Sequence, residues 1–241
     1  ADSLRQINDG WQVLNKNSTL AEAEVVVLAN GIDAASFAQT ASLPLIPVRG
    51  QVSQIDSNER SKHLEAVVVS DRYICPAVDD SHCIGASYGA NETDCEPRLV
   101  DDQENLERIR SVFQNPDLLN EEVVKSRAAV RCNTADYIPV VGAMPDEHCF
   151  KKEFAGLARN ARSPQTQAGT YLPGLFINTG HGSYGLTSCP LSAEFLASLI
   201  NNENLPLPVN IMESLSPCRF IIRNLKKQKP DGLRKSAIVE S

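Results

Sequence analysis

The sequence lacks several of the patterns that define common classes of protein. Its seven cysteines, an odd number, include no pair in C-x-x-C spacing, so we expect neither a zinc site nor a disulfide framework. No apolar run reaches the length that crosses a membrane, and the first residues lack the character of a signal peptide. Scattered cysteines suit a reducing compartment, so we expect a cytoplasmic protein with no metal and no membrane partner.

Positive charge is scarce over most of the chain and is concentrated near its end. The net charge is −7, from 23 basic and 30 acidic residues. The segment 219–241 contains seven basic residues and two acidic ones, so the remainder carries a net charge of −12. An acidic body does not bind polyanions in general, whereas a basic tail provides a local contact for one.

Hydrophobic patterning predicts a chain that alternates between strands and helices. The apolar runs "GWQVLN" and "EVVVLANG" look like a hairpin-like pair of strands, and residues 146–170 look like a polar surface excursion. The other predicted elements are short antiparallel strands between 46 and 90, an amphipathic helix at 101–115, strands at 124–134, 137–145 and 174–179, and a helix ending near residue 200.

The stretch "GHGSYG" at 180–185 matches the G-x-G-x-x-G fingerprint of dinucleotide-binding folds, but its context is different. A true fingerprint opens a βαβ unit whose second strand follows the helix. Here Pro206 and Pro208 follow the helix and block a central strand. The glycine turn and helix N-terminus still offer free N–H groups and a positive partial charge to a flat ligand. The alternative is a glycine turn that only permits tight packing.

Several segments resemble one enzyme family. The run "GLFINTGHGSYGLTSCPLSAEFLASLI" resembles the closing flavin motif of the D-amino-acid oxidase and glycine oxidase family, which has a strand, T-G-H, Gly-Leu, a proline and a helix. "EVVVLANG" and "VRCNTADYIPVVG" are similar to two further segments of that family. With "LPLIPVRGQVSQI" and "HCIGASY", they resemble the oxidase half of the bifunctional tRNA 5-methylaminomethyl-2-thiouridine biosynthesis proteins, from about residue 10 to about residue 228.

The resemblance implies a fold and its division. We expect an α/β protein with an α+β substrate domain, as a C-terminal fragment of a D-amino-acid oxidase-like FAD-dependent oxidoreductase. The family's N-terminal Rossmann βαβ unit is missing from the sequence, as is the methyltransferase half of the bifunctional proteins. The expected parts are a remnant of the FAD-binding domain at 1–45, a substrate domain at 46–130, the rest of the FAD-binding domain at 131–205 and a basic tail at 206–241.

The resemblance also implies FAD as the cofactor. In the family, the helix after the glycine turn points its N-terminus at the pyrimidine edge of the flavin ring and stabilises negative charge there. Because the pyrophosphate site is missing, we expect this chain alone to bind FAD weakly or not at all and to be inactive. His181 fits a hydrogen-bonding or packing role better than acid–base catalysis. The predicted cofactor contacts are Ala29, Gly31, Gly180, His181, Gly182, Ser183, Tyr184, Gly185 and Leu186.

The implied reaction is oxidation of the carboxymethylaminomethyl group on a tRNA wobble uridine, which leaves aminomethyl-uridine and releases glyoxylate. The substrate carboxylate needs a cation, and Arg131 occupies the arginine position of the family's R-x-x-T-x-D segment. The alternative is an ion pair between Arg131 and Asp136. Arg49 is the second candidate, with a structural role as its alternative. Tyr73 and Tyr88 are candidates to close over the substrate, or are packing residues.

The basic tail is predicted to contact tRNA through residues 219–235. Phe220 and its aliphatic neighbours are expected to dock on the body and to leave five cations outward, or the whole tail is disordered. These cations are Arg219, Arg223, Lys226, Lys227 and Lys229. A further expected partner is an N-terminal methyltransferase domain in the parent chain, dependent on S-adenosyl-L-methionine. Two rival readings stay open: an oxidase of free glycine or sarcosine, and a non-catalytic RNA-binding fragment.

Overall fold

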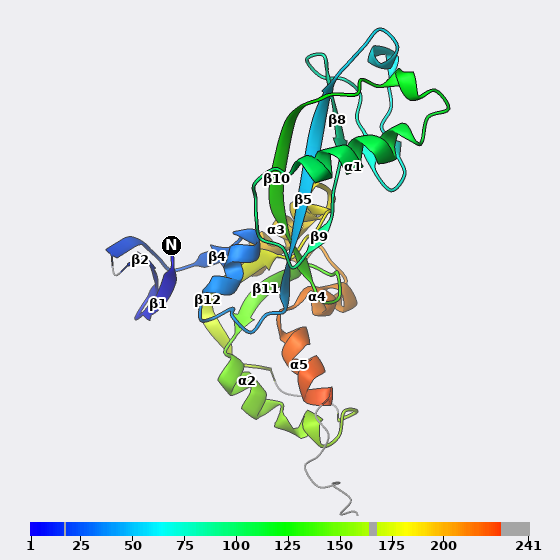
Figure 1. Ribbon diagram of the computed structural model, residues 1–241. Helices are drawn as coiled ribbons and strands as arrows, with labels where there is room; N and C mark the ends of the chain where they lie inside the picture. Colours follow the sequence, from blue (N-terminus) through cyan, green and yellow to red (C-terminus); the bar gives the residue numbers. More distant parts are fainter. Residues whose placement is uncertain (17, 164–167, 228–241) are drawn as a thin grey trace, which may run out of the picture. The chain divides into compact units, whose positions relative to one another are not determined.

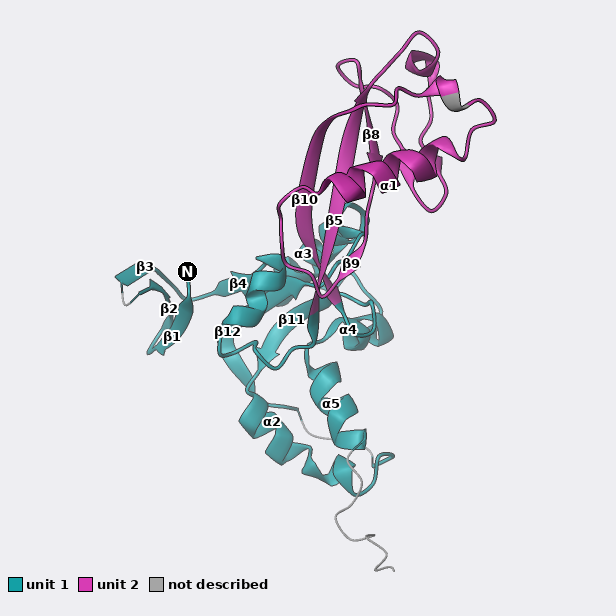
Figure 2. Cartoon of the chain, in the orientation of Figure 1, with its two compact units in different colours: residues 1–45, 134–241 teal, residues 46–133 magenta. Residues whose placement is uncertain are grey.

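A computed structural model of the chain describes residues 1–16, 18–163 and 168–227. The chain divides into two compact units, which Figure 2 draws in different colours. Unit 1 consists of residues 1–45 and 134–241, and unit 2 consists of residues 46–133. Unit 1 is therefore built from two separate stretches of the chain.

Unit 1 begins with a small antiparallel sheet in which consecutive strands pair. Its strands are β1 (Ser3–Ile7), β2 (Gly10–Asn15) and β3 (Ser18–Ala23). Trp11 on β2 is buried, and its indole N–H donates to the carbonyl oxygen of Pro173 at 2.8 Å. The predicted hairpin between 10–15 and 24–31 is wrong, because residues 18–23 form a strand of their own that takes the place beside β2.

A second sheet forms the centre of unit 1 (Figure 1). Its strands, in spatial order, are β11 (Val140–Pro145), β12 (Tyr171–Thr179) and β4 (Val26–Leu28). β12 runs antiparallel to β11 and parallel to β4. The parallel pair brings the segments that follow β4 and β12 to the same edge of the sheet. The 3-10 helix η1 (Gly31–Ser36) follows β4, and α3 (Gly185–Asn201) follows β12.

The final helices of unit 1 pack on apolar side chains from elsewhere in the unit. α4 (Val209–Leu215) joins α3 over β11, where Phe195, Leu196 and Leu215 are buried. α5 (Cys218–Lys227) follows it. Residues 206–227 are thus largely helical and packed, while the rest of the predicted tail, 228–241, lies outside the described residues.

The segment 146–163 also belongs to this packed layer. α2 (Glu147–Glu153) and the 3-10 helix η4 (Ala155–Ala158) bury Phe150, Phe154 and Leu157 against α5. The prediction of a polar surface excursion is therefore wrong here, because three apolar side chains of the segment share a core with α5. Residues 164–167 lie outside the described part of the chain.

Unit 2 is a six-stranded sheet with one α-helix on it. The spatial order is β10-β5-β8-β7-β6, and β9 also pairs with β5. Its strands and helices are β5 (Leu45–Asp56), η2 (Ser61–His63), β6 (Val68–Val69), β7 (Tyr73–Ile74), β8 (Ser81–Gly85), β9 (Gly89–Ala90), α1 (Leu99–Arg110), η3 (Pro116–Leu118) and β10 (Val123–Thr134). The predicted antiparallel strands and amphipathic helix are present, with shorter strands at β6 and β7.

The two faces of this sheet differ in what covers them. Successive strand residues point to opposite faces, and Ile55 on β5 packs with Ile84 on β8 and Ile109 on α1. Helix α1 therefore covers the face of odd-numbered β5 residues. The even-numbered β5 residues, Gly50 among them, belong to the opposite face.

Candidate functional site

In unit 1, the predicted flavin-binding residues lie at the carboxyl ends of two parallel strands. Leu28 on β4 pairs with Ile177 on β12, so the segments that follow both strands leave the sheet together. The hydroxyl of Thr179 donates to the carbonyl oxygen of Gly31 at 2.9 Å and joins the two segments. The edge of a sheet beyond parallel carboxyl ends is where α/β folds bind ligands.

The glycines of this turn are required by the backbone. Gly31, Gly180 and Gly182 have φ values of 63°, 79° and 55°, which side chains other than glycine rarely adopt. A Cβ atom on Gly180 would also lie 2.7 Å from the Cγ2 atom of buried Thr134. The turn therefore combines a left-handed backbone with a close approach to the end of β10.

The N-terminus of α3 presents open donors. Tyr184 stands at the N-cap position but gives no side-chain cap. Within the described residues, the backbone N–H groups of Gly185 and Leu186 donate no hydrogen bond, and the side chains of Tyr184 and Leu186 are 76% and 98% exposed. Free N–H groups and a partial positive charge at a helix start suit an electron-rich ring edge. Ser183 is exposed beside them.

His181 is fixed within unit 1 by two hydrogen-bond partners. Its Nδ1 lies 2.8 Å from the Ser188 hydroxyl, and its Nε2 lies 2.8 Å from Oδ1 of Asn178. Burial lowers the pKa of His181, so the ring is neutral at pH 7. Both nitrogens are occupied, by Asn178 on β12 and Ser188 on α3, which is the arrangement of a hydrogen-bonding residue.

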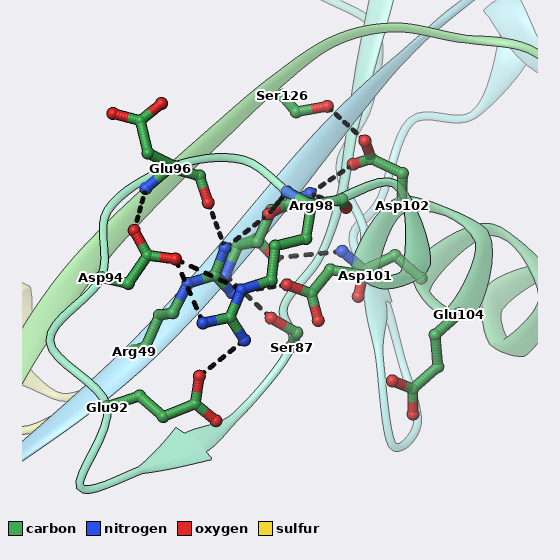
Figure 3. Close-up of polar contacts among 12 residues, drawn as sticks. Arg49, Ser87, Glu92, Asp94, Glu96, Arg98, Asp101, Asp102, Glu104 and Ser126 are labelled. Carbon is green, nitrogen blue, oxygen red and sulfur yellow. Dashed lines mark hydrogen bonds and ion pairs between the residues drawn. The ribbon is translucent and has the colours of Figure 1, made fainter.

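In unit 2, Arg49 lies on the covered face, where both terminal nitrogens of its guanidinium are bonded while its buried Nε has no partner among the described residues (Figure 3). Its side chain is 2% exposed and pairs with the Asp101 carboxylate at 2.5 Å. It also donates to Oε1 of Gln51 at 2.9 Å and to the carbonyl oxygen of Glu96 at 2.7 Å. This arrangement supports the structural alternative for Arg49.

A buried polar network continues from Arg49 across the covered face. The Asp102 carboxylate on α1 accepts hydrogen bonds from the side chains of Gln51 and Ser53. It also accepts one from the Ser126 hydroxyl (Figure 3). The Asn105 amide donates to Ser53 and to the carbonyl oxygen of Gln51. Helix α1 is thus held on β5 and β10 by hydrogen bonds as well as apolar contacts.

Arg131 has different surroundings. Ser126 of the same strand faces α1, so strand alternation places Arg131 on the opposite face. Its guanidinium lies across Gly50: a Cβ atom there would come within 1.9 Å of Nη1 and 2.6 Å of Cζ. Within the described residues, Arg131 forms no ion pair and no hydrogen bond. The predicted alternative, a pair with Asp136, is not what the structure shows, because Asp136 pairs with Arg219 and Arg223.

Tyr73 lies near Arg131 on unit 2. Its pKa is raised, chiefly by burial and by the neighbouring thiols of Cys83 and Cys75, while the Arg131 charge acts in the opposite direction. The phenol is therefore protonated at neutral pH and is a hydrogen-bond donor. Tyr88 is exposed, and its hydroxyl accepts a hydrogen bond from the Asn133 amide at 3.4 Å.

The sequence prediction missed Gly50, although a glycine inside a strand signals close approach of another group.

In the described ranges, no group of three or more histidine, cysteine, aspartate or glutamate residues is placed to hold a metal ion. No helix among the described residues is long and apolar enough to span a bilayer. None of the described cysteines forms a disulfide bond.

Comparison with protein families and curated proteins gives two findings. Residues 1–199 match the family model for FAD dependent oxidoreductase (DAO). The chain is 40% identical over 228 residues to the "tRNA 5-methylaminomethyl-2-thiouridine biosynthesis bifunctional protein MnmC" of Stutzerimonas stutzeri, covering 92% of this chain and 34% of the relative. The MnmC of Pseudomonas syringae pv. syringae is 38% identical over 232 residues, with 94% and 35% covered. The chain thus spans about a third of the length of these curated relatives.

Solved structures share the fold. A glycine oxidase from Geobacillus kaustophilus superposes with a TM-score of 0.70 at 22% identity, over 90% of this chain and 51% of that one. An iminodiacetate oxidase from Chelativorans sp. BNC1 gives 0.66 at 20% identity, over 89% and 52%. The predicted fold class, a mixed α/β fold of the D-amino-acid oxidase type, is confirmed, and the chain covers about half of each of these structures.

Proposed function

Because this chain belongs to the FAD dependent oxidoreductase (DAO) family, we propose that it is the oxidase part of a bifunctional tRNA-modifying enzyme. The reaction is oxidation of the carboxymethylaminomethyl group on a tRNA wobble uridine, which yields aminomethyl-uridine and glyoxylate. The MnmC relatives support this choice by name, and they match over more than nine-tenths of the chain.

The observation that carries the proposal is the guanidinium of Arg131, which pairs with none of the residues that the structure describes. A buried or half-buried arginine without a partner retains its full capacity to bind a carboxylate with two parallel hydrogen bonds. Arg131 is half-buried, and its guanidinium rests on Gly50 rather than on an acidic side chain. We assign it the carboxylate of the carboxymethyl group. Tyr73, a protonated phenol nearby, is a second donor for the same carboxylate.

The turn in unit 1 fits the ring of a flavin. The left-handed glycines permit close approach, and the free N–H groups of Gly185 and Leu186 suit the electron-rich pyrimidine edge. Ala29, Gly31 and residues 180–186 would hold that edge, with His181 fixing the turn through Asn178 and Ser188. When bound, FAD supplies the hydride acceptor for the reaction.

The proposed oxidation and hydrolysis need few groups from the protein. The carbon between nitrogen and carboxylate loses a hydride, and the nitrogen loses a proton, which leaves a carbon–nitrogen double bond. Water adds across that bond, and the carbon–nitrogen bond then breaks to release glyoxylate and the primary amine. Arg131 keeps the carboxylate in place throughout, and Tyr73 donates a hydrogen bond without transferring its proton.

The remainder of the activity is assigned to the parent protein. The relatives are bifunctional and about three times as long as the match, so we place a methyltransferase domain, dependent on S-adenosyl-L-methionine, in the same parent chain.

We also propose that these 241 residues alone bind FAD at least about a thousandfold more weakly than the parent, a loss of roughly 4 kcal/mol. A yellow protein that retains one tightly bound FAD per 241-residue chain contradicts this.

The tRNA contact is assigned to residues 219–235, of which 219–227 are described. Lys226 and Lys227 are exposed at the end of α5. The prediction that Arg219 points outward is wrong, because its side chain is 9% exposed and pairs with Asp136. Lys229, Arg234 and Lys235 lie outside the described residues. We place the enzyme in the cytoplasm, because its substrate tRNA is found there and because cysteines without disulfide bonds suit a reducing compartment.

The direct test uses the parent protein with FAD and tRNA that carries the carboxymethylaminomethyl group. We expect glyoxylate and aminomethyl-uridine in equal amounts, and little oxidation of free glycine or sarcosine. Rapid oxidation of free glycine or sarcosine without turnover of the tRNA would reassign the chain to an amino-acid oxidase.

A further inference from the structure

A groove on unit 1 combines cations with an exposed aromatic ring. It lies beside α5 and is lined by Arg219, Arg223, Lys226 and Lys227, with Tyr171 and Phe154 also in its wall. Its volume of about 630 Å³ is in the range that accepts a nucleotide-sized ligand. Figure 1 shows α5 and α2 near each other in this part of the unit, and both belong to the layer that buries Phe150.

The cations of the groove divide into two pairs. Arg219 and Arg223 both bind the Asp136 carboxylate, at 3.0 and 2.7 Å, so their charge is partly neutralised. Lys226 and Lys227 are exposed and form no ion pair with any described residue. One acidic side chain in the groove lining, Glu213, opposes them. The two lysines are therefore the cations available to an incoming anion.

The surrounding layer is basic although the chain is acidic. Residues 146–163 and 209–227 contain eight basic residues against four acidic ones, a net charge of +4, whereas the whole chain carries −7. Lys152, Arg159 and Arg162 are exposed on the same layer. A local field of this sign attracts a polyanion that the rest of the protein repels.

Tyr171 provides a second, uncharged kind of contact. Its side chain is 41% exposed, and the edge-to-face contact with Phe150, at 5.9 Å between ring centroids, holds the ring in place. The Cys218 thiol donates to its hydroxyl at 3.4 Å. An exposed, fixed aromatic ring beside unpaired lysines is the combination that binds single-stranded nucleic acid, because bases stack on the ring while phosphates meet the cations.

We propose that this groove binds a single-stranded segment of the RNA substrate, with phosphates at Lys226 and Lys227 and a base on the ring of Tyr171. The proposal rests on the proposed function, in which the parent acts on tRNA. A membrane surface or an acidic protein would meet the lysines but would not use the ring as a stacking platform.

The test measures binding of substrate tRNA to the parent protein at several salt concentrations. Lys226→Ala/Lys227→Ala removes two phosphate contacts, so the slope of log affinity against log salt falls by about 1.4, or 0.7 per contact. The same change weakens binding about 25-fold at about 0.1 M salt. Arg60→Ala/Lys62→Ala, which removes two exposed cations of unit 2, one of them paired with Glu59, is the control and leaves both quantities unchanged.

The ring is tested separately from the charges. Tyr171→Leu removes the stacking surface and weakens tRNA binding by about 5- to 150-fold, with the salt slope unchanged. Tyr171→Phe keeps the ring and loses the hydroxyl, so it binds tRNA as the wild type does. Thermal unfolding of both variants separates loss of stacking from loss of the fold.

The outcomes separate the groove from the reaction. The groove proposal is wrong if both Tyr171→Leu and the lysine variant bind tRNA as the wild type does. It is also wrong if the Arg60/Lys62 control loses as much affinity as the lysine variant. A parent protein that binds no tRNA overturns it as well. If the parent binds tRNA with the expected pattern but oxidises no carboxymethylaminomethyl nucleoside, the proposed reaction fails and the groove stands. If it oxidises the free nucleoside and all groove variants bind tRNA normally, the groove alone fails.

Discussion

Arg49 and Arg131 belong to neighbouring strands of unit 2, but their guanidinium groups have opposite surroundings. Arg49 lies under α1, where the carboxylate of Asp101, the amide of Gln51 and a backbone carbonyl accept hydrogen bonds from its two terminal nitrogens. Arg131 lies on the other face, over a glycine, and none of the described residues accepts its hydrogen bonds. A cation whose partners lie inside the fold therefore stabilises the structure, whereas a cation without such partners is available to a ligand.

Unit 1 contains the same contrast along a single helix. Arg219 at the start of α5 pairs with Asp136 and also donates to the carbonyl oxygen of Ile138. Lys226 and Lys227 at the end of the helix have no such partner among the described residues. The first end fastens α5 to the unit, and the second is open to an anion.

The largest expected effect is loss of stability in Arg49→Ala. This change leaves the Asp101 carboxylate, which is 14% exposed, without its cation, and it lowers the free energy of unfolding by about 3 kcal/mol. Hydrogen exchange of the β5 and α1 amides in the parent protein measures it. Arg131→Ala is the matched control and changes local stability by less than about 0.5 kcal/mol. Equal losses in the two variants would remove the distinction between the arginines.

The next effect is catalytic and belongs to Arg131. Arg131→Ala removes a charge-assisted pair worth about 1.5–3 kcal/mol, so kcat/KM for the carboxymethylaminomethyl substrate falls roughly 10- to 150-fold, mainly through KM. Arg131→Lys restores part of it, since a lysine cannot form the two-pronged contact. Steady-state kinetics on the parent protein measure both. Unchanged kinetics in Arg131→Ala would contradict the assignment of the carboxylate to Arg131.

Gly50→Ala tests the position of the Arg131 guanidinium, because it moves that group without removing it. The added methyl group would displace the guanidinium, which is the far end of a flexible side chain, so the fold is retained and kcat/KM falls about tenfold, no more than in Arg131→Ala. In the Arg131→Ala background the same change has no further effect, because its target is gone. Gly156→Ala, where a Cβ meets nothing within 4 Å, is the control. Additive losses in the double variant would show that Gly50 acts independently of Arg131.

The smallest effect tests the paired end of α5 through pH. Burial alone would raise the pKa of Asp136, but the hydrogen bonds from Arg219 and Arg223 outweigh it and hold the pKa well below its usual range. A lowered pKa contributes stability that is present above about pH 4 and is lost as the pH falls further. Asp136→Asn therefore lowers the free energy of unfolding by about 1–2 kcal/mol at pH 7. In this variant the free energy of unfolding also falls less steeply as the pH drops below about 4. Urea unfolding from pH 7 to pH 2 measures this, with exposed Asp9→Asn as control.

Local signals in the sequence predicted local structure well. The apolar run before Gly180 predicted β12, and the helix expected to end near residue 200 is α3. Of the three motif glycines, Gly180 and Gly182 have positive φ in the turn, whereas Gly185 begins α3. The amphipathic spacing of Leu106, Ile109 and Phe113 placed α1. The signal for α2 was present but missed: Asp146 caps the helix by accepting from the Cys149 N–H, and Phe150 and Phe154 recur at helical spacing.

Long-range pairing could not be read from the sequence. β4 pairs with β12, about 150 residues away, and nothing local in "VVVLANG" distinguishes that partner from the nearby β2. The Asp136–Arg219 pair spans 83 residues and decides which cations are free. Which of Arg49 and Arg131 lies under α1 depends on strand register, because a shift of one residue exchanges the two faces.

The most direct test of the account compares two substrates that differ in one group. The parent protein and its Arg131→Ala variant are assayed with the carboxymethylaminomethyl nucleoside and with its carboxamide analogue, which has the same shape without the charge. The account predicts that the parent prefers the carboxylate by roughly 10-fold or more in kcat/KM and that Arg131→Ala shows no preference. An Arg131→Ala variant that retains the full preference for the carboxylate would contradict the assignment of Arg131.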